Sequence, residues 1–216
     1  REMEELSGLR TEVGNDANVA ALGEMWLGAG KGQENMIMVT LGTGVGGGII
    51  VDGKPLVGAH GAGGEIGHMC VNLEETDTCG CGGHGCLEQY ASATGISRLA
   101  RKKMEHETRA TILTKEDLSA KAVFDAVKEG DEVAIEVATE MGNYLGHAMA
   151  DMAAVLDPAV FVIGGGVSKA GEVLLSFIEK PFMEKAFFAN KNVKFKLATL
   201  GNDAGICGAA KLVLED

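Results

Sequence analysis

Apolar residues follow two patterns in different parts of the chain. Some form short continuous runs, and others recur at helical spacing. Continuous runs bounded by turn signals are typical of buried strands, and apolar residues three or four positions apart are typical of helices. The runs predict strands at residues 36–41, 49–51, 56–57, 159–163 and 193–200. The helical spacing predicts helices at residues 17–28, 86–106 with a break near Gly95, 115–128, 131–156, from 168 to about 178 and 204–214, with the tail of a helix in residues 1–10. Gly142 and Gly146 within the longest of these helices suggest close helix packing.

The segment between residues 58 and 85 shows neither pattern. Asp52 and Gly53 predict a hairpin turn shortly before it, and the chain then continues without periodicity to Gly85. So long an irregular stretch is uncommon in a compact domain unless a ligand or a metal holds it. We therefore expect this segment to carry a binding site.

Composition and charge restrict the classes of function. Hydrophobic residues make up 46% of the 216 residues and charged residues 23%, as in ordinary globular domains. The formal net charge of −12 argues against nonspecific binding to nucleic acids and anionic membranes, because such binding depends on Lys and Arg. No apolar run approaches the roughly 18 residues of a membrane-spanning helix, and the first residues do not resemble a signal peptide. We expect a cytoplasmic protein.

Two clusters among the 32 glycines could approach a phosphate. Residues 42–48, Gly-Thr-Gly-Val-Gly-Gly-Gly, lie between two predicted strands, where backbone N–H groups can point at an anion without an intervening side chain. This stretch is neither a P-loop nor a dinucleotide fingerprint, and taken alone it could be only a tight turn. Residues 164–168 follow a predicted strand and open a helix, the position at which open α/β sheets bind ligands. A turn that requires positive φ explains this second stretch equally well.

A cysteine-rich segment gives the strongest local signal. Residues 79–86, Cys-Gly-Cys-Gly-Gly-His-Gly-Cys, combine thiols with glycines that would let the backbone wrap around an ion. Thiolates and imidazole are preferred ligands of zinc, and four of them leave no open position, which is typical of a structural metal. The predicted ligands are His68, Cys79, Cys81 and Cys86. His84 and Cys70 are alternative ligands, and free thiols or a disulfide are the alternative to a metal.

Acidic residues at predicted helix starts could bind or activate a substrate. Asp16 precedes the helix at 17–28, where a carboxylate could accept a proton from a substrate hydroxyl during phosphoryl transfer. Sequence spacing alone favours a simpler role, because Asn15 or Asp16 could merely cap the helix. Glu65 and His68 fall within one short turn and Glu88 follows the last cysteine, so a metal-held loop would make them a preorganised set for sugar hydroxyls. For Glu88, the alternative is a favourable acid in the first turn of a helix.

The order of these motifs resembles the ROK family of sugar kinases, repressors and open reading frames. The resemblance spans nearly the whole chain and rests on residues 15–18 (Asn-Asp-Ala-Asn), 41–48 (Leu-Gly-Thr-Gly-Val-Gly-Gly-Gly), 64–68 (Gly-Glu-Ile-Gly-His), 79–88 (the cysteine-rich segment with Leu-Glu) and 163–168 (Ile-Gly-Gly-Gly-Val-Ser). Residues 88–95, Glu-Gln-Tyr-Ala-Ser-Ala-Thr-Gly, are most similar to the glucokinase branch. The resemblance implies an α/β, actin-like (ribonuclease H-like) ATPase lobe with an inserted zinc-binding loop. It also implies ATP-dependent phosphorylation of a hexose, with glucose as the first choice.

The same resemblance implies a role for each motif residue. Asp16 would be the catalytic base for the sugar 6-hydroxyl. Sugar hydroxyls would be bound by Asn15, Asp16, Glu65, His68 and Glu88, and His68 would also ligate zinc with Cys79, Cys81 and Cys86. ATP would be bound by Gly42, Thr43, Gly44 and Gly46 at the phosphates and by Gly165 and Gly166 near the adenosine. ATP, magnesium and structural zinc are the implied cofactors, and a homodimer is the usual assembly of the family.

One departure from the family pattern shapes the domain prediction. The first phosphate motif of the family, Asp-x-Gly-Gly-Thr, appears nowhere in residues 1–216. We therefore expect residues 1–216 to be the C-terminal lobe of a longer kinase, with a zinc- and sugar-binding loop at 58–90 and a helix at 205–216 that could pack on the N-terminal lobe. This piece alone is then expected to have little or no kinase activity.

Three alternatives remain open from the sequence. The first is the sugar-sensing domain of a ROK repressor, whose DNA-binding domain would precede residue 1. The second is a kinase for N-acetylmannosamine or fructose, and the third is a zinc-stabilised interaction module without a small-molecule site. The Asn15-Asp16 pair and the glycine loop favour the enzyme over the repressor, because a sensor needs no catalytic base.

Overall fold

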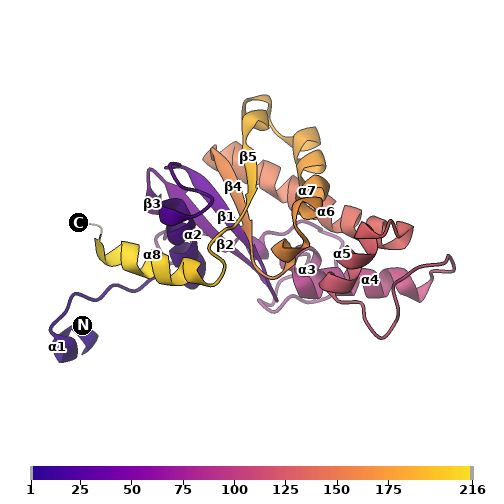
Figure 1. Cartoon of the computed structure of the whole chain (residues 1–216), viewed down its shortest axis with the longest axis horizontal. Helices are drawn as coiled ribbons and strands as arrows, with labels where there is room; N and C mark the ends of the chain where they lie inside the picture. Colours follow the sequence, from indigo (N-terminus) through magenta and orange to yellow (C-terminus); the bar gives the residue numbers. More distant parts are fainter. Residues whose placement is uncertain (1, 215–216) are drawn as a thin grey trace.

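The fold is built on one mixed sheet, seen in a computed structural model that describes residues 2–214 (Figure 1). The sheet has five strands in the order β3-β2-β1-β4-β5. Their bounds are Met36–Leu41 (β1), Val45–Val51 (β2), Lys54–Pro55 (β3), Val160–Gly164 (β4) and Lys194–Leu197 (β5). β1 pairs in parallel with β4 and antiparallel with β2, and β4 pairs in parallel with β5. The predicted α/β class is confirmed.

Helices cover both faces of the sheet. One face carries α2 (Asp16–Leu27) and α8 (Asp203–Leu214). Helix α8 packs on α2. In the described part of the chain, five helices pack around the core on the other face: α3 (Glu88–Ala91), α4 (Ala93–Glu105), α5 (Ala120–Lys128), α6 (Glu132–Leu156) and α7 (Glu172–Lys185). Side chains of β1 alternate accordingly, since Met36 and Met38 join the core with α2 whereas Ile37 and Val39 join the larger core. A strand buried on both sides is largely apolar, which explains the run at residues 36–41, where the polar Thr40 is only half-buried.

Short elements complete the chain. Three 3₁₀ helices span Ile66–His68 (η1), Val167–Ala170 (η2) and Phe188–Asn192 (η3). Helix α1 (Glu2–Ser7) has no buried residue and lies apart from the body of the protein (Figure 1). None of the helices within residues 2–214 is long and apolar enough to span a membrane.

The glycine stretch at 42–48 differs from its prediction as a loop. Only residues 42–44 form the turn, because β2 begins at Val45 and its three glycines pair with β1. The cause is the close packing of other segments, since α2 lies on Gly46 and Gly48 and residues 64–66 lie on Gly47. A Cβ added at Gly48 would be 2.4 Å from the Cβ of Ala21 and 2.5 Å from the carbonyl oxygen of Ala17. Glycine is used here for close approach of α2 and not for a turn.

Several element boundaries also differ from the predictions. The break in the helix predicted at 86–106 falls at Ser92, whose Oγ accepts a hydrogen bond from the Gly95 N–H and caps α4. Helix α5 begins at Ala120, five positions after the predicted start, since Ser119 caps it. Helix α7 continues to Lys185 through Pro181, which is buried and packs on Gly146 of α6. This contact and that of Gly142 with Phe177 confirm the close helix packing predicted from the two glycines.

Candidate functional site

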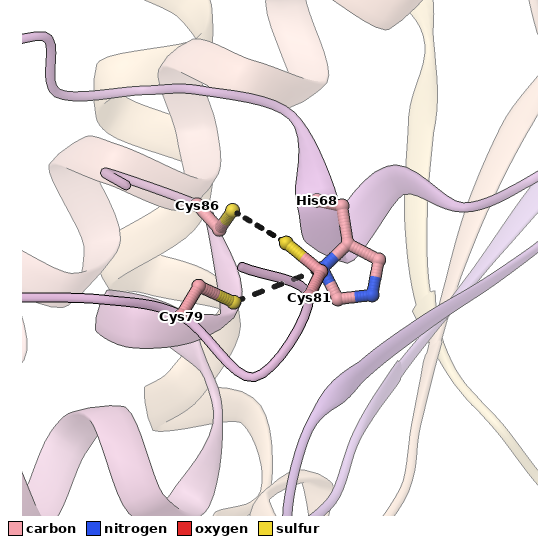
Figure 2. Close-up of side chains that lie close together, drawn as sticks. All are labelled: His68, Cys79, Cys81 and Cys86. Atoms are coloured by element: carbon pink, nitrogen blue, oxygen red, sulfur yellow. Dashed lines mark hydrogen bonds between the residues drawn. The ribbon is translucent and has the colours of Figure 1, made fainter. Parts of the chain in front are cut away.

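Four side chains of the irregular segment converge on one point. The ligand atoms of His68, Cys79, Cys81 and Cys86 all lie within 4.8 Å of one another (Figure 2). The Cys81 and Cys86 sulfurs are 3.6 Å apart, and the Cys79 sulfur is 3.8 Å from the His68 Nδ1. Ligands about 2.3 Å from a zinc ion at tetrahedral angles are about 3.8 Å from one another. The four atoms therefore fit zinc.

The chemistry of the thiols also fits a cation. All three cysteines are free, and the spacing of their sulfurs is far beyond the roughly 2.05 Å of a disulfide bond. Burial raises the pKa of Cys79, and burial together with a hydrogen bond to Cys79 raises the pKa of Cys86 to about 12. Cys81 differs, because a hydrogen bond from the Gly83 N–H lowers the pKa of its thiol. A coordinated metal would deprotonate all three thiols. The alternative ligands His84 and Cys70 lie outside this cluster.

The course of the backbone around the cluster explains why glycines lie between the cysteines. The Cys79 N–H donates to the Gly83 carbonyl, which closes a small loop around Cys81. Gly85 has φ +68°, and a Cβ at this position would lie 1.9 Å from the Asn72 carbonyl oxygen. Neither the conformation nor the contact admits a side chain, so the segment can turn back on itself only with glycine here.

His68 and Glu88 connect this cluster to a neighbouring loop. The His68 Nδ1 faces the sulfurs, and Figure 2 shows the second ring nitrogen pointing away from them. One Glu88 carboxylate oxygen lies 3.1 Å from the Cys79 sulfur, and the other would be 2.6 Å from a Cβ added at Gly44. Glu88 therefore lies between the cysteine cluster and the turn at residues 42–44.

Glu65 is exposed and immediately precedes η1, which rests on β2. Two glycines permit this contact. A Cβ on Gly67 would lie 2.1 Å from the Val45 carbonyl oxygen, and one on Gly64 would lie 2.5 Å from the Gly47 carbonyl oxygen. The β2 glycines thus receive η1 as well as α2, which places both segments on one strand.

Asn15 and Asp16 have different roles at the start of α2. Asn15 is the N-cap, and its side-chain oxygen accepts hydrogen bonds from the N–H groups of Ala17 (2.9 Å) and Asn18 (3.3 Å). Within residues 2–214, the only hydrogen bond of the exposed Asp16 carboxylate comes from the adjacent Ala17 N–H, at 2.8 Å. Asp16 is therefore not needed as the cap. Its carboxylate lies in the first turn of α2.

The two predicted phosphate loops lie side by side. Thr40 at the end of β1 pairs with Gly164 at the end of β4. Gly165 has φ +84°, and a Cβ there would lie 2.5 Å from the Leu41 carbonyl oxygen. The turn at 42–44 and the turn at 164–166 therefore meet at the carboxyl ends of two parallel strands, the edge at which α/β sheets bind ligands. Gly46 lies within β2, beneath Thr40 and Ala17.

A hollow of about 340 Å³ opens beside Gly166, and the sequence singled out only a few of the residues in its walls. Its lining is mostly apolar and comes from α4, α5 and η2. The lining residues are Ala93, Ser119, Ala120, Lys121, Phe124, Asp125, Lys128, Gly166, Val167, Lys169 and Ala170. Ala93, Gly166 and Val167 lie in motifs seen in the sequence. No motif marks the other lining residues, because they come from separate elements that only the fold assembles; the Ser119 cap was the available signal.

The predicted site residues do not all line one hollow. Glu88 lines a cavity of about 420 Å³ together with Thr43 and Gly44. Asp16 lines a separate groove of about 590 Å³ between residues 10–14 and α8. The structure therefore places Glu88 with the glycine turn, and links Asp16 to them only through the packing of α2 on β2.

The chain is similar in sequence and in fold to known proteins. The profile of the ROK family matches residues 1–216. A glucokinase of Halalkalibacterium halodurans is 47% identical over 99% of the chain, and a xylose repressor of Caldicellulosiruptor bescii is 30% identical over 94%. The crystal structure of a ROK family glucokinase from Streptomyces griseus in complex with glucose and AMPPNP superposes with a TM-score of 0.84 at 37% identity, over 98% of this chain and 70% of the other. The chain spans 66% of the length of the first of these relatives and 52% of the repressor.

Proposed function

The chain belongs to the ROK family and has its actin-like fold, and on that premise we propose that the full-length protein phosphorylates a hexose with ATP. We propose glucose as the hexose and glucose 6-phosphate as the product. The relatives named glucokinases and the structural neighbour bound to glucose and AMPPNP support this choice.

The contact between Glu88 and Gly44 is the observation that carries the proposal. Phosphoryl transfer requires the acceptor hydroxyl and the terminal phosphate to be held within contact distance. Glu88, from the sugar-binding set, lies directly against the turn that we assign to phosphate. A sugar held by Glu88 would therefore lie next to a phosphate held at residues 42–44.

On the sugar side, we assign hydroxyl binding to Asn15, Asp16, Glu65, His68 and Glu88. Asp16 would accept the proton of the 6-hydroxyl as the phosphoryl group is transferred. Because Asn15 supplies the cap, the Asp16 carboxylate is free for this role. His68 would hold zinc through Nδ1 and present its other ring nitrogen to the sugar, while the metal fixes the loop.

On the nucleotide side, we assign the phosphates to Gly42, Thr43 and Gly44 and the adenosine to the neighbourhood of Gly165 and Gly166. The mostly apolar hollow beside Gly166 has walls suited to an adenine ring. Magnesium would arrive with ATP and neutralise charge on the transferred group. Gly46 differs from the other glycines, because its bare backbone makes room for Thr40 and Ala17, and we assign it to packing.

Residues 1–216 are proposed to form one lobe of this kinase, which would work as a homodimer. Residues 58–90 would be the zinc- and sugar-binding loop. Helix α8 packs on α2 by one side and leaves Ile206 and Leu214 exposed, 71% and 65% respectively. These apolar side chains are available to a second lobe.

A sugar-sensing repressor domain is the second candidate function, favoured by the likeness to the xylose repressor. It would use the same sugar and zinc residues but would need neither a base nor a phosphate turn. The exposed carboxylate of Asp16 and the paired glycine turns favour the kinase.

A substrate panel tests the proposal. The full-length protein would be assayed with ATP and glucose, N-acetylmannosamine, fructose, allose or xylose, with ADP release coupled to a spectroscopic signal. We expect turnover with glucose at the highest kcat/KM. Sugar binding without ADP release on any sugar would support the sensor instead.

A further inference from the structure

The stretch of residues 72–78, here called the arm, leads into Cys79 and is anchored to the helices by side chains outside the metal cluster. Glu75 and Asp77 of the arm both bind Arg98 of α4, through the Arg98 Nη2 at 2.5 and 2.6 Å. The Arg98 Nη1 donates to the Gln89 carbonyl at 3.4 Å. One guanidinium group thus joins the arm to α3 and α4.

Residues of α3 hold the arm from the other side. The Tyr90 hydroxyl donates to Glu75 at 2.6 Å and accepts from the Asn72 amide at 2.9 Å. The Gln89 amide donates to the Asp77 carbonyl at 2.8 Å. Glu88, Gln89 and Tyr90 are consecutive, so the helical turn that carries Glu88 also carries two anchors of the arm.

Arg98, Gln89, Tyr90, Glu75 and Asp77, here called the clamp, are shielded from water at their centre, whereas the Asp77 side chain is 58% exposed. The side chains of Glu75 and Arg98 are 6% and 17% exposed, and Tyr90 is 3% exposed. The Arg98 guanidinium lies 5.5 Å from the centre of the Tyr90 ring, which itself stacks on Tyr144 of α6. Charge pairs that are shielded in this way are stronger and more directional than exposed ones, whose contribution is small.

The position of the clamp relates it to the sugar site. Asp77 is two residues before Cys79, whose sulfur lies 3.1 Å from Glu88. Arg98 and Asp77 also line the 420 Å³ cavity with Glu88, Thr43 and Gly44. Most N–H donors of Arg98 are occupied by Glu75, Asp77 and Gln89, so it fixes the wall of this cavity and is not free to bind a ligand in it.

We propose that Arg98 is a positioning residue for the sugar site: by fixing the arm against α3, it holds Cys79 and Glu88 in the places that sugar binding requires. This inference rests on the proposed function. A lysine cannot replace Arg98 here, because its single ammonium group lacks the planar fork that reaches two carboxylates and a carbonyl together.

Variants of the full-length protein test the proposal by steady-state kinetics and by glucose titration calorimetry. We expect Arg98→Lys to raise the KM and Kd for glucose by about tenfold, while the KM for ATP stays within about twofold, since residues that orient metal ligands such as Cys79 typically contribute about 10- to 100-fold. Asp77→Asn, at a side chain that is 58% exposed, removes part of the clamp without threatening the fold and should give a smaller rise of the same kind.

Arg109→Lys is the matched control. Arg109 also bridges two carboxylates, Glu107 and Glu136, but it is 43% exposed and outside the cavity. Its KM and Kd for glucose and its KM for ATP should equal those of the wild type. If Arg98→Lys and Asp77→Asn are folded and keep the wild-type glucose KM and Kd, the positioning role is wrong. A wild-type protein that neither binds nor phosphorylates glucose would instead contradict the proposed function itself.

Discussion

At Gly48 the absence of a side chain lets α2 lie directly on the sheet. Ala17 and Ala21, one helical turn apart, both contact this position. Asp16 is the residue before Ala17, so the seating of α2 on β2 sets where the proposed base lies relative to the segments on the same strand. Gly48, a small residue in a strand, thus helps to set the position of Asp16 in the proposed site.

Replacing Gly48 with alanine should destabilise the protein by about 1–3 kcal/mol, the usual cost of forcing extra atoms into a packed core. The added Cβ would be 2.5 Å from the Ala17 carbonyl oxygen, so α2 must shift. Denaturant unfolding measures the change. Gly205→Ala is the control, because a Cβ there has nothing within 4 Å and alanine favours a helix. Equal stabilities of Gly48→Ala and wild type would contradict this account of the glycines.

Single residues could be predicted from the sequence where the signal is local. Asn15 as a possible cap, the Asp52-Gly53 turn and the glycines of α6 all follow from neighbours along the chain. The role of Gly48 does not, because a glycine in a strand is indistinguishable from a glycine in a loop until the helix packed on it is known. The same holds for Pro181, whose burial against Gly146 lets α7 continue past it.

At the scale of elements, the loop between β3 and α3 has two kinds of anchor, the cysteine cluster and the clamp at Arg98. The ligands could be predicted because cysteine and histidine are rare and closely spaced here. The clamp could not, since Arg98 and its carboxylate partners are more than twenty positions apart with no period that relates them.

Metal removal tests the cluster. We expect one zinc per chain, and its removal by a chelator should accelerate hydrogen exchange in residues 58–87 while β1 and β4 stay protected, because structural zinc contributes on the order of 10 kcal/mol in small peptides. Cys81→Ser should lose the metal and Cys70→Ser should keep it, since Cys70 is exposed and outside the cluster. Metal retained by Cys81→Ser but lost by Cys70→Ser would show that the ligands are assigned wrongly.

Lowering the pH should weaken the clamp, because the Glu75 carboxylate becomes protonated. Burial alone raises the pKa of this carboxyl, but hydrogen bonds from Tyr90 and Arg98 outweigh it and lower the pKa from 4.5 to about 2. A carboxyl with a lowered folded-state pKa stabilises the fold above its unfolded pKa, and this contribution is lost as the pH falls towards the folded value. The difference between a pKa of 4.5 and one of about 2 corresponds to about 3 kcal/mol in the free energy of unfolding.

Unfolding of wild type and Glu75→Gln should be compared between pH 7 and pH 2. Wild type should be more stable by about 3 kcal/mol near pH 7, and this advantage should shrink below about pH 4.5 and be small near pH 2. Comparing the two proteins at each pH removes the effect of acid on the metal ligands, which both share. An advantage that stays constant over this range would contradict the role given to Glu75.

At the scale of the whole molecule, the strand order assembles the site. Pairing of β1 with β4 joins two glycine turns that are more than one hundred residues apart in the sequence, and β2 receives both α2 and η1. Each motif and the fold class could be predicted from the sequence. The adjacency of the turns, the hollow beside Gly166 and the contact of Glu88 with Gly44 depend on long-range pairing that no local pattern encodes.

The most direct test of the central claim is the turnover of Asp16→Asn in the full-length protein with ATP and glucose. Because Asn15 caps α2 and Asp16 is exposed, the variant should fold normally and bind glucose with a Kd within a few-fold of wild type. Its kcat should fall by about a thousandfold, within the 10²–10⁴ that general bases typically contribute. A variant that binds glucose and retains the wild-type kcat would show that Asp16 is not the base.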